Sequence, residues 1–351
     1  MPLTVKAHKG DAKTLLAFDL PKDETPRLAG FTIQCQPQGQ APYYLFNDLQ
    51  FETPGNHAQV ATEPPYSSVN APFHKFRWLH VPGVAHQGLK PFFGPYTYTV
   101  TPRYFDDNQS MLPLDSSLSV SVNVNVVPFV KGSLEIRFTR GYVQSQGYVR
   151  RFGSKAVIRP AGKDLVFDTS GQAGIDPKGS PFRWVDEYVW LGYTARERIF
   201  EVLEDVLSDS SLHLDVFAYD LNEPDIVTDL LQLAEEGRIR VILDNASLHH
   251  ASAGHPPEPE DEFETEFKAR ATGQAAIKRG HFGRFAHDKI MIVSSAGVPG
   301  TVLTGSTNFS VTGLYVNSNH VLVFTGSGVP EKYAELFEEV WKDQVQLAPV
   351  Q

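Results

Sequence analysis

The chain has 351 residues, of which 41% are hydrophobic and 21% charged, enough for one large or two ordinary domains with buried cores. Its net charge of −10 argues against a protein built mainly to bind nucleic acid, although a local basic groove remains compatible with it. Cys35 is the single cysteine, which excludes an intrachain disulfide and a thiolate metal cluster. No apolar run has the length of a membrane span or of a signal peptide, so we expect a cytoplasmic protein.

Residues 1–130 are predicted to form an all-β domain. The stretch SLSVSVNVNVV at 117–127 alternates valines with polar residues, the period-two pattern of a half-buried strand. PYTYTVTPRYF at 95–105 repeats this pattern, and Pro/Gly turns such as 91–94 separate the candidate strands. Several short strands of this kind predict a β-sandwich, and YTYTV is similar to a strand of a fibronectin type III or immunoglobulin-like domain.

Residues 131–190 are predicted to be a connecting segment. Their first part mixes basic residues with tyrosines and phenylalanines, and 168–182 is a loop by composition. Such a basic, aromatic stretch is compatible either with contacts to a phosphate backbone or with the solvated edge of a connecting β-segment.

Residues 191–351 alternate helices and strands. A helical stripe at 199–207 precedes an apolar strand at 212–221, and a second strand follows at 238–245. Between the strands we expect a helix with Asn222 as its cap, Pro224 in its first turn and Gly237 at its end. Strand, helix and strand at this spacing predict a βαβ unit with a parallel pair, and the final helix is expected to cover the sheet.

An insertion between the second strand and residue 287 has ends of opposite charge. Acidic residues crowd its first half, as in a solvated loop, and basic residues dominate the second half: Lys268, Arg270, Lys278, Arg279 and Arg284. Positive charge that leads directly into a candidate site favours an anionic substrate.

The stretch HDKIMIVSSAGVPGTVLTGSTNFS at 287–310 predicts two strands joined by a hairpin. Because residues i and i+2 of a strand point the same way, His287 and Lys289 share one face. Ser306 and Asn308 share another face if the extended course continues, and that face can lie opposite the first. The four residues combine a titratable base, a fixed positive charge and two neutral hydrogen-bonding groups.

These residue types suit phosphoryl chemistry. A neutral imidazole can attack phosphorus and form a covalent intermediate, while lysine and asparagine hold the phosphate oxygens in the transition state, so that no metal is required. For a bare His-x-Lys, the structural alternative is a buried histidine with a lysine that reaches solvent, and that alternative is the more common one.

A longer pattern favours the chemical interpretation. His287-Asp288-Lys289, followed by Gly-Ser-Thr-Asn-Phe-Ser at 305–310 and by TGLYVNSNHVLVF, resembles the HKD motif of the phospholipase D superfamily. The preceding strand, helix and strand are similar to the opening of one repeat of that fold, and the resemblance covers about residues 190–345. It implies an α/β domain with a mixed sheet flanked by helices, preceded by the β-sandwich.

The resemblance also implies roles for individual residues. His287 matches the histidine that attacks phosphorus or protonates the leaving group, and Lys289 matches the phosphate-binding lysine. Ser306 and Asn308 match the polar residues that complete the phosphate pocket. The family is similar in needing no metal and no cofactor, because lysine charges stabilise the equatorial oxygens instead.

Three departures from the family pattern are present. Ser294 stands where an aspartate that shapes the turn is expected, five residues after Lys289. Asn319 stands where an acidic residue usually orients the imidazole; its amide oxygen can accept a ring N–H but stabilises an imidazolium less. Third, the family's active site needs two facing HKD copies, and this sequence has one.

Two arrangements would supply the second copy. A homodimer can pair two His287 residues across a two-fold axis. Alternatively, the chain is the amino-terminal part of a longer enzyme, which its similarity to two-copy bacterial members favours.

The candidate functions are therefore a phosphodiesterase acting on phospholipid or a related phosphodiester, a nuclease that uses Lys278, Arg279 and Arg284, and a non-catalytic half-site or assembly module. His281, Arg284 and Asn319 are further candidates for contact with substrate. His249, His250 and His255 match no standard set of metal ligands, and we predict no metal site there. The sequence has no glycine-rich nucleotide loop and no serine nucleophile elbow.

Overall fold

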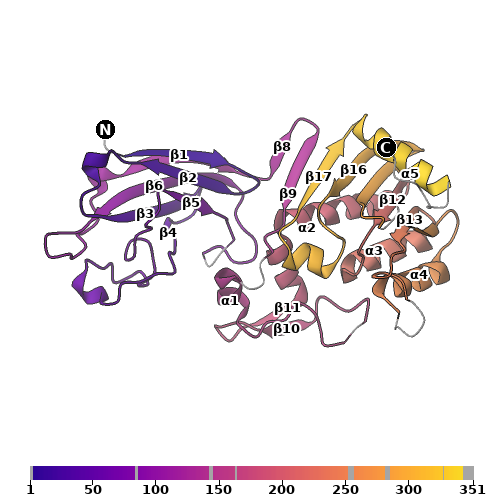
Figure 1. Cartoon of the computed structure of the whole chain (residues 1–351), viewed down its shortest axis with the longest axis horizontal. Coiled ribbons are helices and arrows are strands. Elements are labelled where there is room, and N and C mark those ends of the chain that lie inside the picture. Colours follow the sequence, from indigo (N-terminus) through magenta and orange to yellow (C-terminus); the bar gives the residue numbers. More distant parts are fainter. Residues whose placement is uncertain are drawn as a thin grey trace. The chain divides into compact units, whose positions relative to one another are not determined.

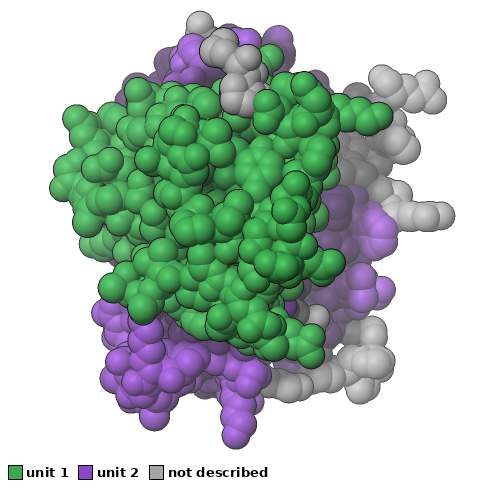
Figure 2. Space-filling model, turned by 90° about the vertical axis from the view of Figure 1, so that its left-hand side faces the viewer, with its two compact units in different colours: residues 1–128 green, residues 129–351 purple. Residues whose placement is uncertain are grey.

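The computed structural model describes residues 3–83, 86–141, 145–162, 164–251, 257–280, 285–326 and 328–342. The chain divides into two compact units, residues 1–128 and 129–351, which are coloured separately in Figure 2. Within the described ranges, no helix has the length and apolar character needed to cross a membrane.

The first unit is all-β, as predicted. One sheet contains β1 (Thr4–Lys9), β2 (Thr14–Asp19) and β5 (Arg77–His80). The other has the order β4 (Tyr43–Tyr44), β3 (Leu28–Pro37), β6 (Gly94–Tyr104) and β7 (Val120–Val126). Side chains from both sheets share one core, in which Phe18, Ile33 and Tyr98 are buried. Alternating strands that pack one apolar face against the other sheet give the two-layer sandwich.

An eight-stranded mixed sheet organises the second unit (Figure 1). In spatial order its strands are β14 (Ala276–Gly280), β13 (Ile239–Asp244), β12 (Leu212–Ala218), β15 (Lys289–Ser295), β16 (Val298–Gly305), β17 (His320–Thr325), β9 (Leu134–Phe138) and β8 (Phe129–Lys131). The pairs β12–β13 and β13–β14 are parallel, and the remaining neighbours are antiparallel. The predicted parallel pair and mixed sheet are confirmed.

Helices flank this sheet. The final helix, α5 (Val329–Lys342), packs on β15, β16 and β17 through Phe337 and Val340, as its apolar stripe predicts. The other elements of the unit are α1 (Gln146–Phe152), β10 (Gln172–Ile175), β11 (Pro181–Arg183), α2 (Trp184–Ser208), α3 (Pro224–Glu235), α4 (Pro259–Arg270) and the π-helix η4 (Thr312–Val316). Helix α2 contacts β9 and β12, and α3 contacts β13. The mixed sheet with flanking helices matches the predicted fold class.

The cap of α3 differs from the prediction. Pro224 occupies the first helical position, so Glu223 and not Asn222 precedes the helix as its N-cap. The Glu223 carboxylate accepts a hydrogen bond from the backbone N–H of Ile226 at 2.7 Å. Gly237 ends the helix with φ +74, as expected for a glycine after the C-cap.

Residues 131–190 contribute more than a connection between the two units. Strand β9 pairs with β17 and extends the large sheet, although its sequence lies far from that of β17. Its Arg137 pairs with Glu135 and donates to the carbonyl of Phe129, so this basic side chain is committed inside the unit. The start of α2 also lies within these residues.

The predicted hairpin at 287–310 is confirmed, with a shorter turn than the sequence suggested. β15 and β16 pair from Met291↔Leu303 to Ser295↔Val298, leaving Ala296 and Gly297 as the turn. Both turn residues have positive φ, 47° and 79°, the conformation of a type I′ turn.

A buried carboxyl between α1 and α2 makes stability depend on pH. Glu187 is fully buried and accepts a hydrogen bond from the hydroxyl of Tyr148. Burial raises its pKa from 4.5 to about 7, against the hydrogen bond, which lowers it. Because the folded state keeps this proton up to about pH 7 and the unfolded state loses it near pH 4.5, stability falls as pH rises between those values.

We therefore expect Glu187→Gln to stabilise the chain relative to wild type by up to about 3 kcal/mol at pH 8 and by little at pH 4. Glutamine keeps the acceptor for Tyr148 but never ionises. Urea unfolding at both pH values measures the difference, with Glu204→Gln, an exposed site on the same helix, as the control. An equal effect of Glu187→Gln at both pH values would contradict a raised pKa.

Candidate active site

The candidate residues meet at one edge of the large sheet. The parallel strands β12 and β13 end there, at Ala218 and Asp244, and the antiparallel β15 begins there, because Ala218 is paired with Lys289. β16 ends at the same edge and β17 begins there, since Gly305 is paired with Val321. The carboxyl ends of parallel strands are a common location for ligand sites in α/β sheets.

His287 and Lys289 both contact Tyr219, the residue that follows β12. The imidazole ring of His287 lies 4.4 Å from the Tyr219 ring, and Lys289 Nζ lies 5.0 Å from the same ring. His287 is exposed, whereas Lys289 is 5% exposed and donates a hydrogen bond to the His287 carbonyl at 2.8 Å. The two side chains share a face, as their spacing predicts, and the lysine charge lies beside an accessible imidazole.

The surroundings lower the pKa of both groups. For His287, partial burial acts first and the Lys289 charge second, so the imidazole is mainly neutral at pH 7 and can serve as a nucleophile. For Lys289, burial lowers the pKa, and the charges of Asp288, Asp220 and Asp244 oppose this.

Ser306 and Asn308 follow β16 at the same edge. Ser306 Oγ is 3.0 Å from both Asn319 Oδ1 and His320 Nδ1. Asn308 Nδ2 donates to Asp220 at 3.4 Å, and its buried Oδ1 has no hydrogen-bond partner within the described chain. Asp220 directly follows Tyr219, the residue that His287 and Lys289 both contact. The hydrogen bond to Asp220 therefore connects Asn308 to the same segment.

Asn319 orients the side chain of Ser306 through a hydrogen bond. Its Oδ1 accepts from the Ser306 hydroxyl, and its Nδ2 donates to the Gly313 carbonyl at 2.8 Å. Both ends of the amide are thus engaged with the Ser306 and η4 segments, whereas the sequence suggested an acceptor for the imidazole of His287.

A buried polar network supports the part of the site that carries Ser306 and Asn308. The hydroxyl of Tyr315, in η4, donates to Glu223 at 2.8 Å and accepts from Arg196 Nε at 3.0 Å. Burial raises the pKa of Glu223 to about 7, and the charge of Arg196 opposes the shift. Tyr188 of α2 stacks on Tyr315 with ring centroids 4.1 Å apart. The network joins α2, α3 and η4 and so fixes the loop that carries Asn308.

A second histidine lies close to the first. His249 follows β13, is 8% exposed, and its ring also contacts the Tyr219 ring, with centroids 4.3 Å apart. Its Nδ1 is 2.9 Å from Asp244 Oδ2. Burial opposes a charged Asp244, but hydrogen bonds from His249 and the amides of Ala286 and Ala246 lower its pKa overall. Asp244 therefore holds the ring as an ionised acceptor.

The basic stretch before His287 is largely committed to internal contacts. Arg279 is paired with Asp261 at 2.8 Å, and its side chain is 9% exposed. Lys278 lies on the Trp341 ring and donates to the Trp341 carbonyl. His281 and Arg284, predicted to contact substrate, lie outside the described residues.

The three histidines considered as metal ligands do not form one group in the described chain. His249 pairs with Asp244, whereas His250 pairs with Asp261 at 2.6 Å. His255 lies outside the described residues.

Five residues of this edge were not singled out from the sequence: Tyr219, Asp220, Asp244, Glu260 and His320. Tyr219, Asp220 and Asp244 lie at the carboxyl ends of predicted parallel strands. Because ligand sites are common there, this position could have identified them as candidate site residues. Glu260 was hidden in an acidic run, and His320 immediately follows Asn319.

Comparison with known proteins assigns part of the chain to a described domain family. Residues 203–341 match the family model described as "Cardiolipin synthase, PLD-like domain". No curated protein matches the chain significantly.

Solved structures that match part of this chain include Nuc, NucT and a phosphatidylserine synthase. Nuc from Salmonella typhimurium, a phospholipase D family member, is 18% identical with a TM-score of 0.33 and aligns over 42% of this chain and 90% of its own. NucT from Helicobacter pylori is 14% identical, with a TM-score of 0.34, over 44% and 94%. Phosphatidylserine synthase from Haemophilus influenzae is 10% identical, with a TM-score of 0.29, over 66% and 41%.

Residues 203–341 are a phospholipase D-like domain, a type of domain typical of phosphodiesterases.

Proposed function

We propose that this chain is a phosphodiester hydrolase that acts through a phosphohistidine on His287 and needs no metal for bond cleavage. The observation that carries the proposal is the exposed, mainly neutral imidazole beside the Lys289 ammonium at a shared sheet edge. A nucleophile and a fixed positive charge are the two elements that attack on an anionic phosphodiester requires.

Each residue has a defined task in this mechanism. His287 attacks phosphorus, the P–O bond to the leaving group breaks, and water then hydrolyses the phosphohistidine. Lys289 stabilises the charge on the equatorial oxygens, and Ser306 and Asn308 donate hydrogen bonds to the same oxygens. In the free site the Ser306 hydroxyl donates to Asn319 Oδ1, so it turns from that acceptor to the phosphate oxygen when substrate binds.

The leaving group needs a proton from a second acid. A second HKD copy, from a homodimer partner or from a further part of a longer enzyme, supplies that histidine in our proposal. A chain without it would bind phosphate and not turn over, which is the half-site alternative.

Among substrates, we favour a phospholipid or related small phosphodiester over nucleic acid. The net charge is −10, and the two described basic residues proposed to contact DNA, Lys278 and Arg279, are engaged with Trp341 and Asp261. We retain the cytoplasm as the expected location. A nuclease would instead bind DNA with an affinity that falls steeply with salt.

The test is hydrolysis of bis(4-nitrophenyl) phosphate in EDTA, with molar mass measured by light scattering on the same fractions. Turnover that elutes with a dimer is expected if two His287 residues pair across a two-fold axis, whereas no turnover is expected if the second copy belongs to a further part of a longer enzyme. Phosphatidylglycerol vesicles and duplex DNA are then compared as substrates at 50 and 200 mM salt.

The outcomes separate the alternatives. Turnover in EDTA with preference for vesicles supports the proposal, and salt-sensitive cleavage of DNA supports the nuclease. A folded monomer that binds inorganic phosphate without turnover supports the half-site module and overturns hydrolysis by this chain alone.

A further inference from the structure

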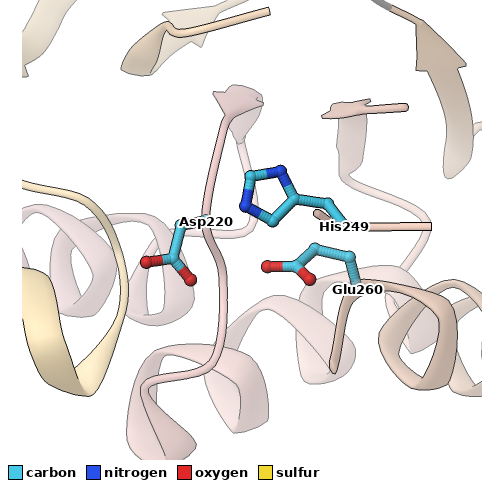
Figure 3. A group of neighbouring side chains, drawn as sticks. All are labelled: Asp220, His249 and Glu260. Carbon is cyan, nitrogen blue, oxygen red and sulfur yellow. The ribbon is translucent and has the colours of Figure 1, made fainter. Parts of the chain in front are cut away.

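Three side chains beside the candidate active site converge on one small space (Figure 3). Asp220 follows β12, His249 follows β13, and Glu260 lies in the first turn of α4. Each offers one ligand atom, and these atoms all lie within 4.8 Å of one another. The group therefore combines one imidazole and two carboxylates from three separate segments.

The imidazole of His249 is held in a defined orientation. Asp244 accepts hydrogen bonds from the backbone N–H groups of Ala246 and Ala286, at 2.9 and 2.6 Å, and lies 2.9 Å from His249 Nδ1. A carboxylate at Nδ1 places the ring proton on that atom. The other nitrogen, Nε2, is then free to bind a metal, and in Figure 3 the ring of His249 lies beside the carboxylates of Asp220 and Glu260. Histidines that bind metals commonly donate their other N–H to a carboxylate in this way.

The two carboxylates are held by amide groups. Glu260 is 1% exposed and accepts a hydrogen bond from the Leu221 N–H at 2.8 Å. Asp220 accepts from the amides of Asn222 and Asn308. Among the described residues, no lysine or arginine forms an ion pair with either carboxylate.

We propose that Asp220, Glu260 and Nε2 of His249 bind one divalent transition-metal ion, Zn²⁺ or Mn²⁺. An imidazole ligand favours such ions over Mg²⁺ and Ca²⁺, which prefer oxygen ligands alone. Donor atoms on a tetrahedral zinc ion, with bonds of about 2.1 Å, lie roughly 3.4 Å apart. Side chains already within 4.8 Å reach that spacing by small rotations.

The ion would support the neighbouring site without taking part in the attack on phosphorus. Asp220 contacts Asn308, and Glu260 holds the backbone of Leu221, which pairs with Phe309. A bound cation therefore fixes the segment that presents Asn308 and cancels negative charge next to the phosphate pocket. Metal binding itself goes beyond the proposed hydrolysis and does not depend on it.

The test is equilibrium dialysis of the tag-free full chain, stripped with EDTA and desalted, against micromolar Zn²⁺ or Mn²⁺, with bound metal measured by plasma mass spectrometry. We expect one equivalent in wild type and an increase in melting temperature when the ion is added. Asp220→Asn and Glu260→Gln should weaken binding at least tenfold. Asp244→Asn should weaken it by about 10- to 100-fold through misorientation of His249.

His250→Ala is the matched control, because this neighbouring histidine is half-exposed and pairs with Asp261 outside the group. It should bind one equivalent like wild type. Circular dichroism checks that each variant is folded, and the partly exposed Asp220→Asn decides the matter if Glu260→Gln does not fold. A wild type that binds no stoichiometric ion, or an Asp220→Asn variant that binds as wild type does, overturns the site. Neither result depends on phosphodiester hydrolysis.

Discussion

Replacing His287 by alanine should lower kcat for phosphodiester hydrolysis by at least about 10⁴-fold, because it removes the proposed nucleophile. Alanine also leaves Lys289 in place, so binding of inorganic phosphate should persist. The measurement is steady-state hydrolysis of bis(4-nitrophenyl) phosphate, together with rapid-quench trapping of the phosphohistidine at alkaline pH. We expect the trapped adduct on His287 in wild type and no adduct in the variant.

His213→Ala provides the control for this substitution. His213 lies on β12 at the opposite end of the strand from Tyr219 and is exposed, so its loss should leave kcat unchanged. In wild type, the apparent pKa of the acid limb of the kcat/KM profile should be lower than 6.5, the ordinary value for histidine, because burial and Lys289 lower the pKa of His287. A His287→Ala variant with more than about 1% of wild-type kcat, or an adduct on another histidine, would exclude His287 as the nucleophile.

Gly305→Ala should destabilise the chain by about 3 kcal/mol and disturb the phosphate pocket at the same time. Gly305 has φ +145, a conformation that residues with a side chain rarely adopt. A Cβ there would lie 2.4 Å from the His320 carbonyl oxygen and 3.0 Å from Val321 Cα, both backbone atoms of β17. The carbonyl of His320 also accepts from Ser306 N and Thr307 Oγ1, so its displacement moves the Ser306 segment.

Scanning calorimetry of the full chain measures this effect, and a decrease in melting temperature of roughly 10 °C is expected for a unit of this size. Gly300→Ala is the matched control on the same strand, because a Cβ there meets nothing within 4 Å. Equal melting temperatures for the two variants would show that β16 and β17 separate easily at Gly305, contrary to the close contact described here.

Much of the fold follows from local patterns in the sequence. Alternating valines in the stretch 117–127 predict a strand because side chains alternate across a sheet, and β7 occupies Val120–Val126 within that stretch. The apolar stripe of α5, the β12–α3–β13 unit and the β15–β16 hairpin follow in the same way from periodicity and turn residues. The predicted N-cap of α3 was wrong because a single residue determines its position. Pro224 occupies the first helical position, so the N-cap is Glu223 and not Asn222.

The candidate site was predicted in part. The spacing of His287 and Lys289 places both on one face, and the resemblance to a known motif adds Ser306 and Asn308. The contact of His287 and Lys289 with Tyr219 was not predictable, because it depends on the antiparallel register that sets Ala218 opposite Lys289. The bond from Asn319 to Ser306 likewise depends on the pairing of β16 with β17.

The sequence by itself determined the periodic elements, the order of the two units and the histidine and lysine motif, because each depends on residues close together in the chain. Only the tertiary structure decided which distant residues share the site. Asp244 orients His249, Glu260 joins Asp220, and Arg279 is neutralised by Asp261. These contacts join strands and helices far apart in sequence, so they follow from strand order and register and not from local pattern.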